Sequence, residues 1–268
     1  MKQLFVIGVL ITCISCFQSE NKNNRVVKTI LVVLAHPDDE TAFGPILSRF
    51  ANENKEVYLV IATDGRYGVE DHAGISSGDR LAAIRKEETI CASEILGINP
   101  PIFLEAHDSF GILSGINEYF EQTTQLKNTI SRLIEEINPD VIMTFGPDGD
   151  TGHLDHKGIS DLVTEIIVRN QGWYEKYPLY YLAWPKEKEF WIPQGELTNL
   201  NYVDLQYRNV HLKYNQKDQS TFFESLHCYK SQFTSKDIDL WIMAEKKDTT
   251  YTMYFREFSI NNQVKTTL

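Results

Sequence analysis

Two short clusters of histidine and aspartate side chains stand out in this chain of 268 residues. The first cluster is His36-Pro-Asp-Asp-Glu40, and the second is His153-Leu-Asp-His156. Two histidines and one carboxylate that leave a coordination position open are typical of a catalytic zinc site. The metal lowers the pKa of its water toward about 7, and a second carboxylate nearby can accept the proton. The two clusters together predict a site that hydrolyses a carbonyl substrate with a metal-activated water.

Each cluster alone has a simpler interpretation. His-Pro-Asp occurs in turns, and consecutive acids after a strand can cap the next helix. The spacing His-x-x-His is also usually incidental. However, the chain has only seven histidines, and three of them fall in these clusters, each of which follows a predicted strand. The combination therefore favours a metal site.

The elements that position these clusters are strands that alternate with helices. Continuous apolar, β-branched runs such as 29–35 are typical of strands buried on both faces of a sheet. The pattern predicts strands at 29–35, 56–63, 102–104 and 140–145, and helices at 41–52, 79–96, 117–137 and 156–169. This alternation predicts an α/β fold with a Rossmann-like, mostly parallel sheet and helices on both faces.

The two clusters follow the first and fourth predicted strands. In an open parallel sheet, ligands bind beyond the carboxyl ends of the strands, at the point where the winding order reverses. The first and fourth strands commonly flank that point. We therefore expect the two clusters to meet at one edge of the sheet.

The remainder of the chain has a different pattern. We expect strands at 180–184, 201–205 and 250–258 and helices at 219–231 and 235–245. No linker, repeat or low-complexity segment separates this part from the rest. The prediction is one domain over residues 26–268, in which the last part is an α+β extension.

The N-terminus has the layout of an export signal. Residues 1–16 contain one lysine and an apolar run too short to span a bilayer comfortably, and they end at Cys16 in a sequence that resembles a bacterial lipobox. Cys13 is a second candidate for lipidation, and a plain signal peptide or an uncleaved anchor are the alternatives. Residues 17–25 are polar and suit a flexible tether. We expect an exported, membrane-anchored lipoprotein on the periplasmic or cell-surface side.

The net charge excludes some classes of binding partner, and the cysteines limit the possible disulfides. The chain has 37 acidic and 26 basic residues, a formal charge of -11, which disfavours nucleic acid because phosphate binding requires a basic face. Membrane contact is expected only through the N-terminal lipid. Cys91 and Cys228 could pair in an oxidising compartment, but we expect them to be buried free thiols.

The sequence Ala35-His-Pro-Asp-Asp-Glu40 and the sequence Gly152-His-Leu-Asp-His156 resemble the motifs of the PIG-L/LmbE-like zinc-dependent N-acetylglucosaminyl deacetylases. The resemblance runs from Leu31 to Gly158. A weaker likeness follows at Tyr229-Lys-Ser-Gln232, where the family often has His-Arg-Ser-Gln. Because Tyr229 replaces that histidine, no catalytic role is assigned to it.

The resemblance implies a role for each residue of the two clusters. His36, Asp39 and His156 match the ligands of Zn²⁺, and the same donor set can hold iron or cobalt. Asp38 matches the general base. His153 matches the histidine that stabilises the oxyanion, and the resemblance implies that Asp155 orients it.

Two residues outside the clusters match positions that contact sugar hydroxyls, namely Arg85 and Asp108. One departure is Thr151, which stands where some members of the family have a tyrosine near the oxyanion. The oxyanion contact of that tyrosine is therefore not assigned to this chain.

The implied activity is removal of an N-acetyl group from an N-acetylglucosamine-containing glycan or glycoconjugate. Two alternatives stay open: a deacylase of another N-acyl small molecule or lipopeptide, and a carbohydrate-binding lipoprotein without catalysis. The presence of Asp38 and His153 beside all three ligands disfavours the second alternative, because a binding protein has no need of a base.

Overall fold

The structure is a computed structural model that describes residues 26–190 and 200–260. The expected signal segment 1–16 and tether 17–25 lie outside the described residues. Among the helices that are described, none combines the length and the apolar character needed to cross a bilayer.

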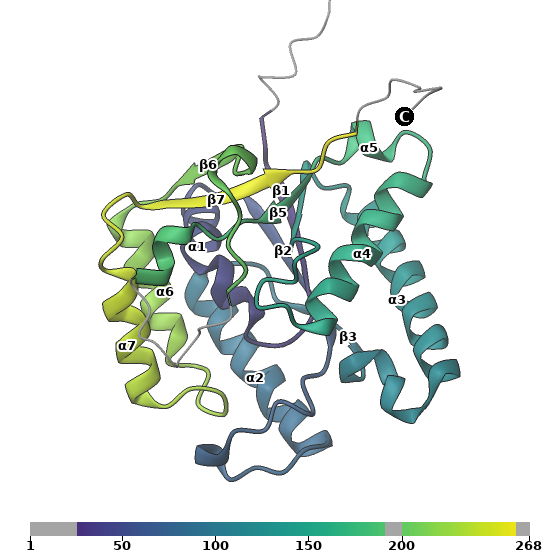
Figure 1. Cartoon of the computed structure of the whole chain (residues 1–268), viewed down its shortest axis with the longest axis horizontal. Coiled ribbons are helices and arrows are strands. Elements are labelled where there is room, and N and C mark those ends of the chain that lie inside the picture. Colours follow the sequence, from purple (N-terminus) through teal and green to yellow (C-terminus); the bar gives the residue numbers. More distant parts are fainter. Residues whose placement is uncertain (1–25, 191–199, 261–268) are drawn as a thin grey trace, which may run out of the picture.

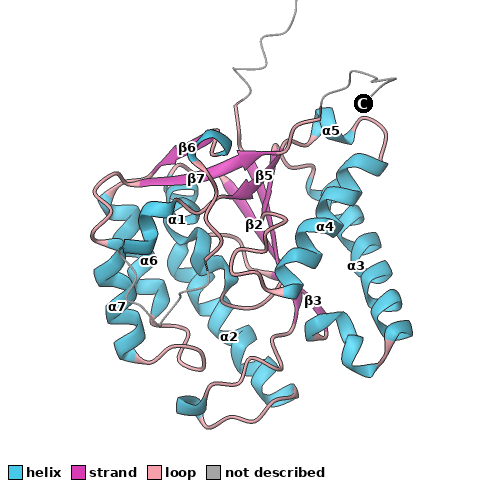
Figure 2. Ribbon diagram, viewed as in Figure 1, coloured by secondary structure: helices cyan, strands magenta, loops and turns pink. Residues whose placement is uncertain are grey.

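One sheet of seven strands runs through the molecule (Figures 1 and 2), in the order β3-β2-β1-β4-β5-β7-β6. The strands are β1 Thr29–Leu34, β2 Glu56–Thr63, β3 Ile102–Ala106, β4 Val141–Thr144, β5 Leu179–Leu182, β6 Val210–Lys213 and β7 Thr252–Glu257. β1 to β5 are parallel, whereas β7 pairs antiparallel with β5 and β6. The predicted mostly parallel α/β sheet is confirmed.

Helices cover both faces of this sheet (Figure 1). They are α1 Gly44–Asn52, α2 Asp79–Leu96, α3 Ile116–Ile137, α4 Leu154–Arg169, α5 Trp173–Lys176, α6 Gln216–Leu226 and α7 Ser235–Glu245. α1, α2 and α6 lie on one face, and α3 and α4 lie on the other. α7 packs on the outside of α6 through Phe222, Leu226 and Ile238.

β1 shows why its sequence is apolar at every position. Ile30, Val32 and Leu34 belong to the core under α1, whereas Leu31 and Val33 belong to the core under α3 and α4. Successive side chains of a strand point to opposite faces, so a strand covered on both faces cannot alternate with polar residues. All five side chains are fully buried.

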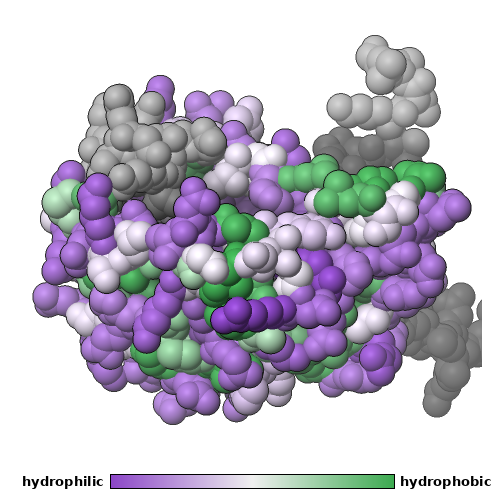
Figure 3. Space-filling view, turned by 90° about the horizontal axis from the view of Figure 1, so that it is seen from below, coloured by the Kyte–Doolittle hydropathy of each residue, from purple (hydrophilic) through white to green (hydrophobic). Residues whose placement is uncertain are grey.

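β1 is also the strand at which the winding reverses, because it pairs with β2 on one side and with β4 on the other. The segments that follow β1 and β4 therefore meet at the carboxyl ends of the parallel strands, which are the lower ends in Figure 1. Seen from these ends, hydrophobic areas are exposed among hydrophilic residues (Figure 3). β1 begins at the opposite end of the sheet.

Two expectations for the last part of the chain are wrong in detail. Residues 201–205 form no strand: Tyr202 makes one isolated bridge to Trp184, and Asp204 accepts a hydrogen bond from the backbone of Gln206 to start a short 3-10 turn. The strand lies at Val210–Lys213 instead, at the sheet edge, where every second residue is exposed. The helix expected at 219–231 is found at Gln216–Leu226: it begins three residues earlier, because Asn215 and Asp218 form a capping box, and it ends five residues earlier.

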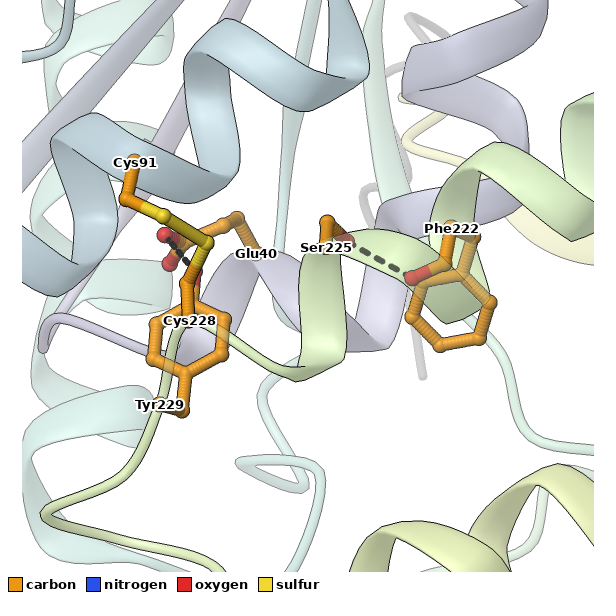
Figure 4. Close-up of a disulfide and its surroundings, with 6 residues drawn as sticks. All are labelled: Glu40, Cys91, Phe222, Ser225, Cys228 and Tyr229. Atoms are coloured by element: carbon orange, nitrogen blue, oxygen red, sulfur yellow. Dashed lines mark hydrogen bonds between the residues drawn. A yellow bond between two sulfur atoms is a disulfide. The ribbon is translucent and has the colours of Figure 1, made fainter.

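The expectation of free thiols is also wrong, because Cys91 and Cys228 form a disulfide (Figure 4). Cys91 lies on α2 and Cys228 lies two residues beyond α6, and their Cα atoms are 5.9 Å apart, within the usual range for a disulfide. Their sequence separation of 137 residues gives no indication of proximity. The packing of α2 against α6 brings them together.

Candidate functional site

The two clusters predicted from the sequence lie together at the carboxyl ends of the parallel strands. The ring of His36, which follows β1, has its centroid 4.7 Å from that of His153 and 5.3 Å from that of His156. The rings of His153 and His156 are 4.9 Å apart. Three imidazoles thus surround a small volume, with the carboxylate of Asp39 between two of them.

The residues His36, Asp39 and His156 fit one tetrahedral cation. Asp39 Oδ1 lies 3.0 Å from His156 Nε2, and Asp39 Oδ2 lies 3.6 Å from His36 Nδ1. Ligand distances of about 2.0–2.1 Å in a tetrahedral site place two donor atoms about 3.4 Å apart. The two observed distances, one to each oxygen of Asp39, lie on either side of that value, so Asp39 is placed to share an ion with either histidine.

Two groups of three side chains in the described residues offer ligand atoms that all lie within 4.8 Å of one another. One group replaces Asp39 with His153, and the other combines His36 with Asp108 and Asp155. In the second group both oxygens of Asp108 accept backbone hydrogen bonds, from Gly65 and Tyr67. Asp39 belongs to neither group; its Oδ2 accepts from the backbone of Ala35 and His36, and its Oδ1 lies 3.0 Å from His156 Nε2.

His36 is oriented by a second carboxylate behind it. Its Nε2 lies 2.9 Å from Asp155 Oδ2, an oxygen that also accepts a 2.7 Å hydrogen bond from the backbone N–H of Ser109. Asp155 is fully buried. The arrangement directs Nδ1 of His36 toward the metal position, because histidine ligands commonly donate their other ring N–H to a carboxylate.

This contact differs from the role that the sequence analysis gave to Asp155. The expected contact was between its carboxylate and His153. Instead the backbone N–H of Asp155 donates to His153 Nδ1 at 3.2 Å, with His153 as the N-cap of α4. Because Nδ1 accepts, Nε2 of His153 carries the ring proton. Burial, together with the nearby His36 and His156, lowers the pKa of His153, so a neutral ring can still donate from Nε2.

His156 has its own support, which the sequence analysis did not identify. Its ring stacks on Phe145 with centroids 4.2 Å apart, and its Nδ1 lies 3.9 Å from Asp150 Oδ2. Asp150 is buried and accepts a hydrogen bond from the indole N–H of Trp184. The only available signal was an additional aspartate in the glycine-rich loop before His153.

Electrostatics in this cluster favour charge on Asp39. Burial alone would raise the pKa of Asp39, but His156 and His36 lower it well below its usual range. Burial alone would lower the pKa of His36, but Asp39 and Asp155 raise it to about 10. A metal ion requires neutral imidazole, so its binding must displace protons from this site.

Asp38 lies beside the metal position, and its closest charged partner is an arginine. Its Oδ2 is 3.0 Å from Arg85 Nη2, and its φ of 92° places it in the left-handed region that residues other than glycine seldom adopt. Burial raises the pKa of Asp38 to about 6, although Arg85 acts in the opposite direction. This carboxylate is ionised at neutral pH and can accept a proton.

The backbone turn of Asp38 is held by two further residues. Its N–H donates to Glu40 Oε2 at 3.1 Å, and Glu40 Oε1 accepts a hydrogen bond from the hydroxyl of Tyr229 (Figure 4). Glu40 and Tyr229 are fully buried or nearly so, and burial raises the pKa of Glu40 to about 8. Tyr229 therefore supports the first cluster from behind without reaching the metal position.

Arg85 and Asp108, expected to contact a sugar, are directed at protein groups. The guanidinium of Arg85 donates to the carbonyl oxygens of Gly65 and Pro37, in addition to its pairing with Asp38. Asp108 holds the backbone of the loop after β2. Both side chains are buried near the site, and contact with a sugar stays a prediction.

The family model for GlcNAc-PI de-N-acetylases (PIG-L) matches residues 31–167, which is just over half of the chain. The chain belongs to the PIG-L family. The matched segment begins within β1 and contains β2 to β4 and every residue of the two clusters. The disulfide partner Cys228, Tyr229 and Trp184 lie beyond it.

The chain is also similar to curated members of the PIG-L family. It is 28% identical over 179 residues to the 1D-myo-inositol 2-acetamido-2-deoxy-alpha-D-glucopyranoside deacetylase of Rhodococcus opacus, a match that covers 61% of each protein. The chain thus spans about 61% of the length of this relative.

Solved structures agree on the fold. The N,N'-diacetylchitobiose deacetylase of Pyrococcus horikoshii has a TM-score of 0.58 at 19% identity, over 87% of this chain and 84% of that one. The 4-carboxy-2-hydroxymuconate hydratase of Pseudomonas putida has a TM-score of 0.61 at 15% identity, over 90% of this chain and all of that one. Because the second enzyme has a different activity, the fold alone does not assign a reaction.

The contact between Asp155 and His36 leads to a testable prediction. We expect Asp155→Asn to weaken metal binding by about 10- to 100-fold, because loss of the carboxylate removes the group that orients His36 Nδ1. The dissociation constant can be measured by competition with a chromophoric chelator. Asp161→Asn, at an exposed acid of the same helix, is the matched control. An unchanged constant in Asp155→Asn would show that His36 needs no such support.

Proposed function

We propose that this PIG-L family protein is a metal-dependent amidase that removes the N-acetyl group from an N-acetylglucosamine-containing glycan or glycoconjugate. The observation that supports the proposal most directly is the separation of two neighbouring carboxylates. Asp39 lies between the two ligand histidines, whereas Asp38 pairs with Arg85 beside them. A metal amidase needs one carboxylate as ligand and one as base.

The donor set of two histidines and one carboxylate suits Zn²⁺, and iron or cobalt can take the same ligands. When bound, such an ion supplies an acidified water and polarises the amide carbonyl. Asp38 then accepts the proton of the attacking water and returns a proton to the leaving nitrogen. His153 donates from Nε2 to the carbonyl oxygen as negative charge develops there.

The substrate class follows from the similar proteins. The relative from Rhodococcus opacus is named for an acetamido sugar linked to inositol. Its sugar carries the N-acetyl group that the proposed chemistry removes. We propose that the substrate of this chain also contains an acetylated amino sugar, but we do not propose that it contains inositol. The matched residues contain the reaction centre and not the whole of either protein.

An acetate-release assay tests the proposal. Purified protein should release acetate from N-acetylglucosamine oligosaccharides, lose this activity after treatment with a chelator, and regain it when Zn²⁺, Fe²⁺ or Co²⁺ is added. His156→Ala is the matched variant, and it should retain no stoichiometric metal. Activity that survives complete removal of the metal would contradict the assignment.

We also propose that the protein is exported and carries a lipid on Cys16. Support comes from the apolar segment that ends at Cys16 and from the Cys91–Cys228 disulfide, since disulfides persist mainly in oxidising compartments. Palmitate labelling of the full chain should disappear in Cys16→Ala and persist in Cys13→Ala. The opposite result would move the lipid to Cys13, and absence of labelling in the unaltered chain would contradict lipidation.

A further inference from the structure

We propose that the metal centre opens onto an acyl pocket, so that this chain hydrolyses N-acyl amino sugars whose acyl group is longer than acetyl. The inference rests on the proposed amidase function and adds the length of the acyl group to it. The pocket has a volume of about 220 Å³, and Asp38, Asp39 and His156 form its wall on the side of the metal position. A group bound there would adjoin the reacting carbonyl.

The far wall of this pocket is largely aromatic and apolar. It includes Trp184, Leu200, Phe233 and Trp241. These four residues all lie beyond the segment 31–167 that the PIG-L family model matches. The reaction centre therefore belongs to the family segment, whereas the shape of the pocket is a property of the rest of this chain.

Several polar groups of the pocket wall, which also includes Thr151, are paired within the protein. Lys188 forms an ion pair with Glu245, and both side chains are buried. Asp150 accepts from the indole of Trp184, and Thr41 donates its hydroxyl to the backbone oxygen of Asp38 at 2.6 Å. A sugar ring brings several hydroxyl groups that each require a partner, and a buried polar group without one is costly. An acyl chain has no such requirement.

A second cavity of about 20 Å³, enough for about one water molecule, adjoins this pocket. The two share wall residues, among them Ala42, Trp184 and Trp241. An acyl chain must therefore lie in the first pocket. A methyl group would fill only a small part of that pocket, whereas a chain of a few more carbons could extend along its apolar wall.

The reaction is ordinary amide hydrolysis with a larger acyl group. Water adds its oxygen to the carbonyl carbon, the carbon–nitrogen bond breaks, and the nitrogen takes up a proton as it leaves. The products are one carboxylic acid and one amino sugar. The reaction needs no oxidant, reductant or second substrate.

The test compares N-acetyl-, N-butyryl-, N-hexanoyl- and N-octanoylglucosamine as substrates of the metal-loaded full chain. Each methylene that is fully buried can contribute up to about a fourfold gain, so we expect kcat/KM to rise at least tenfold from acetyl to hexanoyl. A direct binding measurement uses Asp38→Asn with metal bound, titrated with the N-acetyl and N-hexanoyl compounds by calorimetry. The hexanoyl compound should bind at least tenfold more tightly.

Variants connect this preference to the pocket. Trp241→Ala and Leu200→Trp change the far wall by removal and by addition of volume, and each should reduce the hexanoyl-to-acetyl ratio of kcat/KM at least threefold. Trp173→Ala is the matched control, because Trp173 packs against Tyr177 outside the pocket, and it should leave the ratio unchanged. Since the ratio is internal to each variant, partial loss of folded protein does not affect it, and either pocket variant suffices if the other fails to fold.

The outcomes separate this inference from the proposed function. If acetyl is released and longer acyl groups are not preferred, the acyl pocket is wrong and the amidase function stands. If kcat/KM rises with the number of sugar units and falls in Trp241→Ala, the pocket binds sugar instead, and the inference is overturned. If none of the amides is hydrolysed by the metal-loaded protein, the proposed function itself fails.

Discussion

Asp38→Asn should lower kcat by about 100- to 10,000-fold, the range that general-base catalysis contributes, while the protein keeps its metal. The amide has nearly the shape of the carboxylate but cannot accept the proton of the attacking water. Asp38 pairs with Arg85 and lies outside the group formed by His36, Asp39 and His156, so its change should not weaken metal binding. Single-turnover rates together with metal content measured on the same samples check both parts.

Asp39→Asn is the companion to this variant, with the opposite expected pattern. Its carboxylate is the one that contacts both ligand histidines, so its loss should release the ion, and excess metal should restore part of the activity. If Asp38→Asn lost the ion and Asp39→Asn retained it, the two roles would have to be exchanged.

The pH dependence provides a further check on Asp38. Its pKa is raised to about 6, chiefly by burial, and the base must be deprotonated to act. Activity of the unaltered protein should therefore fall as the pH drops through an acid limb centred no higher than about 6, because a bound cation lowers the pKa of a neighbouring carboxyl. The residual activity of Asp38→Asn should lack this limb.

Removal of the disulfide should lower the free energy of unfolding by about 2–5 kcal/mol. The bond closes a long loop, since its cysteines are 137 residues apart. It also joins α2 to the segment in which the N–H and hydroxyl of Ser231 donate to Glu88 at 2.7 and 2.6 Å. The variant Cys91→Ala/Cys228→Ala should show this loss in urea unfolding curves.

A reductant supplies the control for this experiment. It should destabilise the unaltered protein toward the level of the double variant and leave the double variant unchanged. Unfolding curves of the double variant and the unaltered, oxidised protein that coincide would show that the bond adds nothing to stability. Metal content should be determined in parallel, because a bound ion also stabilises the folded state.

The features of the fold that arise from local sequence were predictable. β1 follows from a continuous run of apolar residues, and Gly97 closes α2 in the left-handed conformation expected of a terminal glycine. β6 was not predictable in the same way, because a four-residue edge strand has too few positions to show a pattern. The disulfide depends on helix packing and leaves no trace in the spacing of its cysteines.

The candidate site also has some features that the sequence predicts and others that depend on the tertiary fold. The proximity of His36, Asp39 and His156 could be predicted because strand order and a specific family motif both indicate it, and their role as metal ligands stays a prediction. The contacts that support them could not: Trp184 is 34 positions from Asp150, and Tyr229 is 189 positions from Glu40. Such partners are set by the tertiary fold, and neighbouring residue types do not indicate them.

The direction of β1 has a consequence for how a tethered molecule would meet its substrates. The histidines follow the carboxyl end of this strand. A strand of six residues is about 20 Å long at the usual rise per residue, so the histidines lie about 20 Å from the point where the strand starts. A lipid on Cys16 would attach the bilayer on the side where β1 starts. The point of attachment and the reactive end of the strands would then lie on opposite sides of the domain, so the lipid anchor would not block the entry of a substrate.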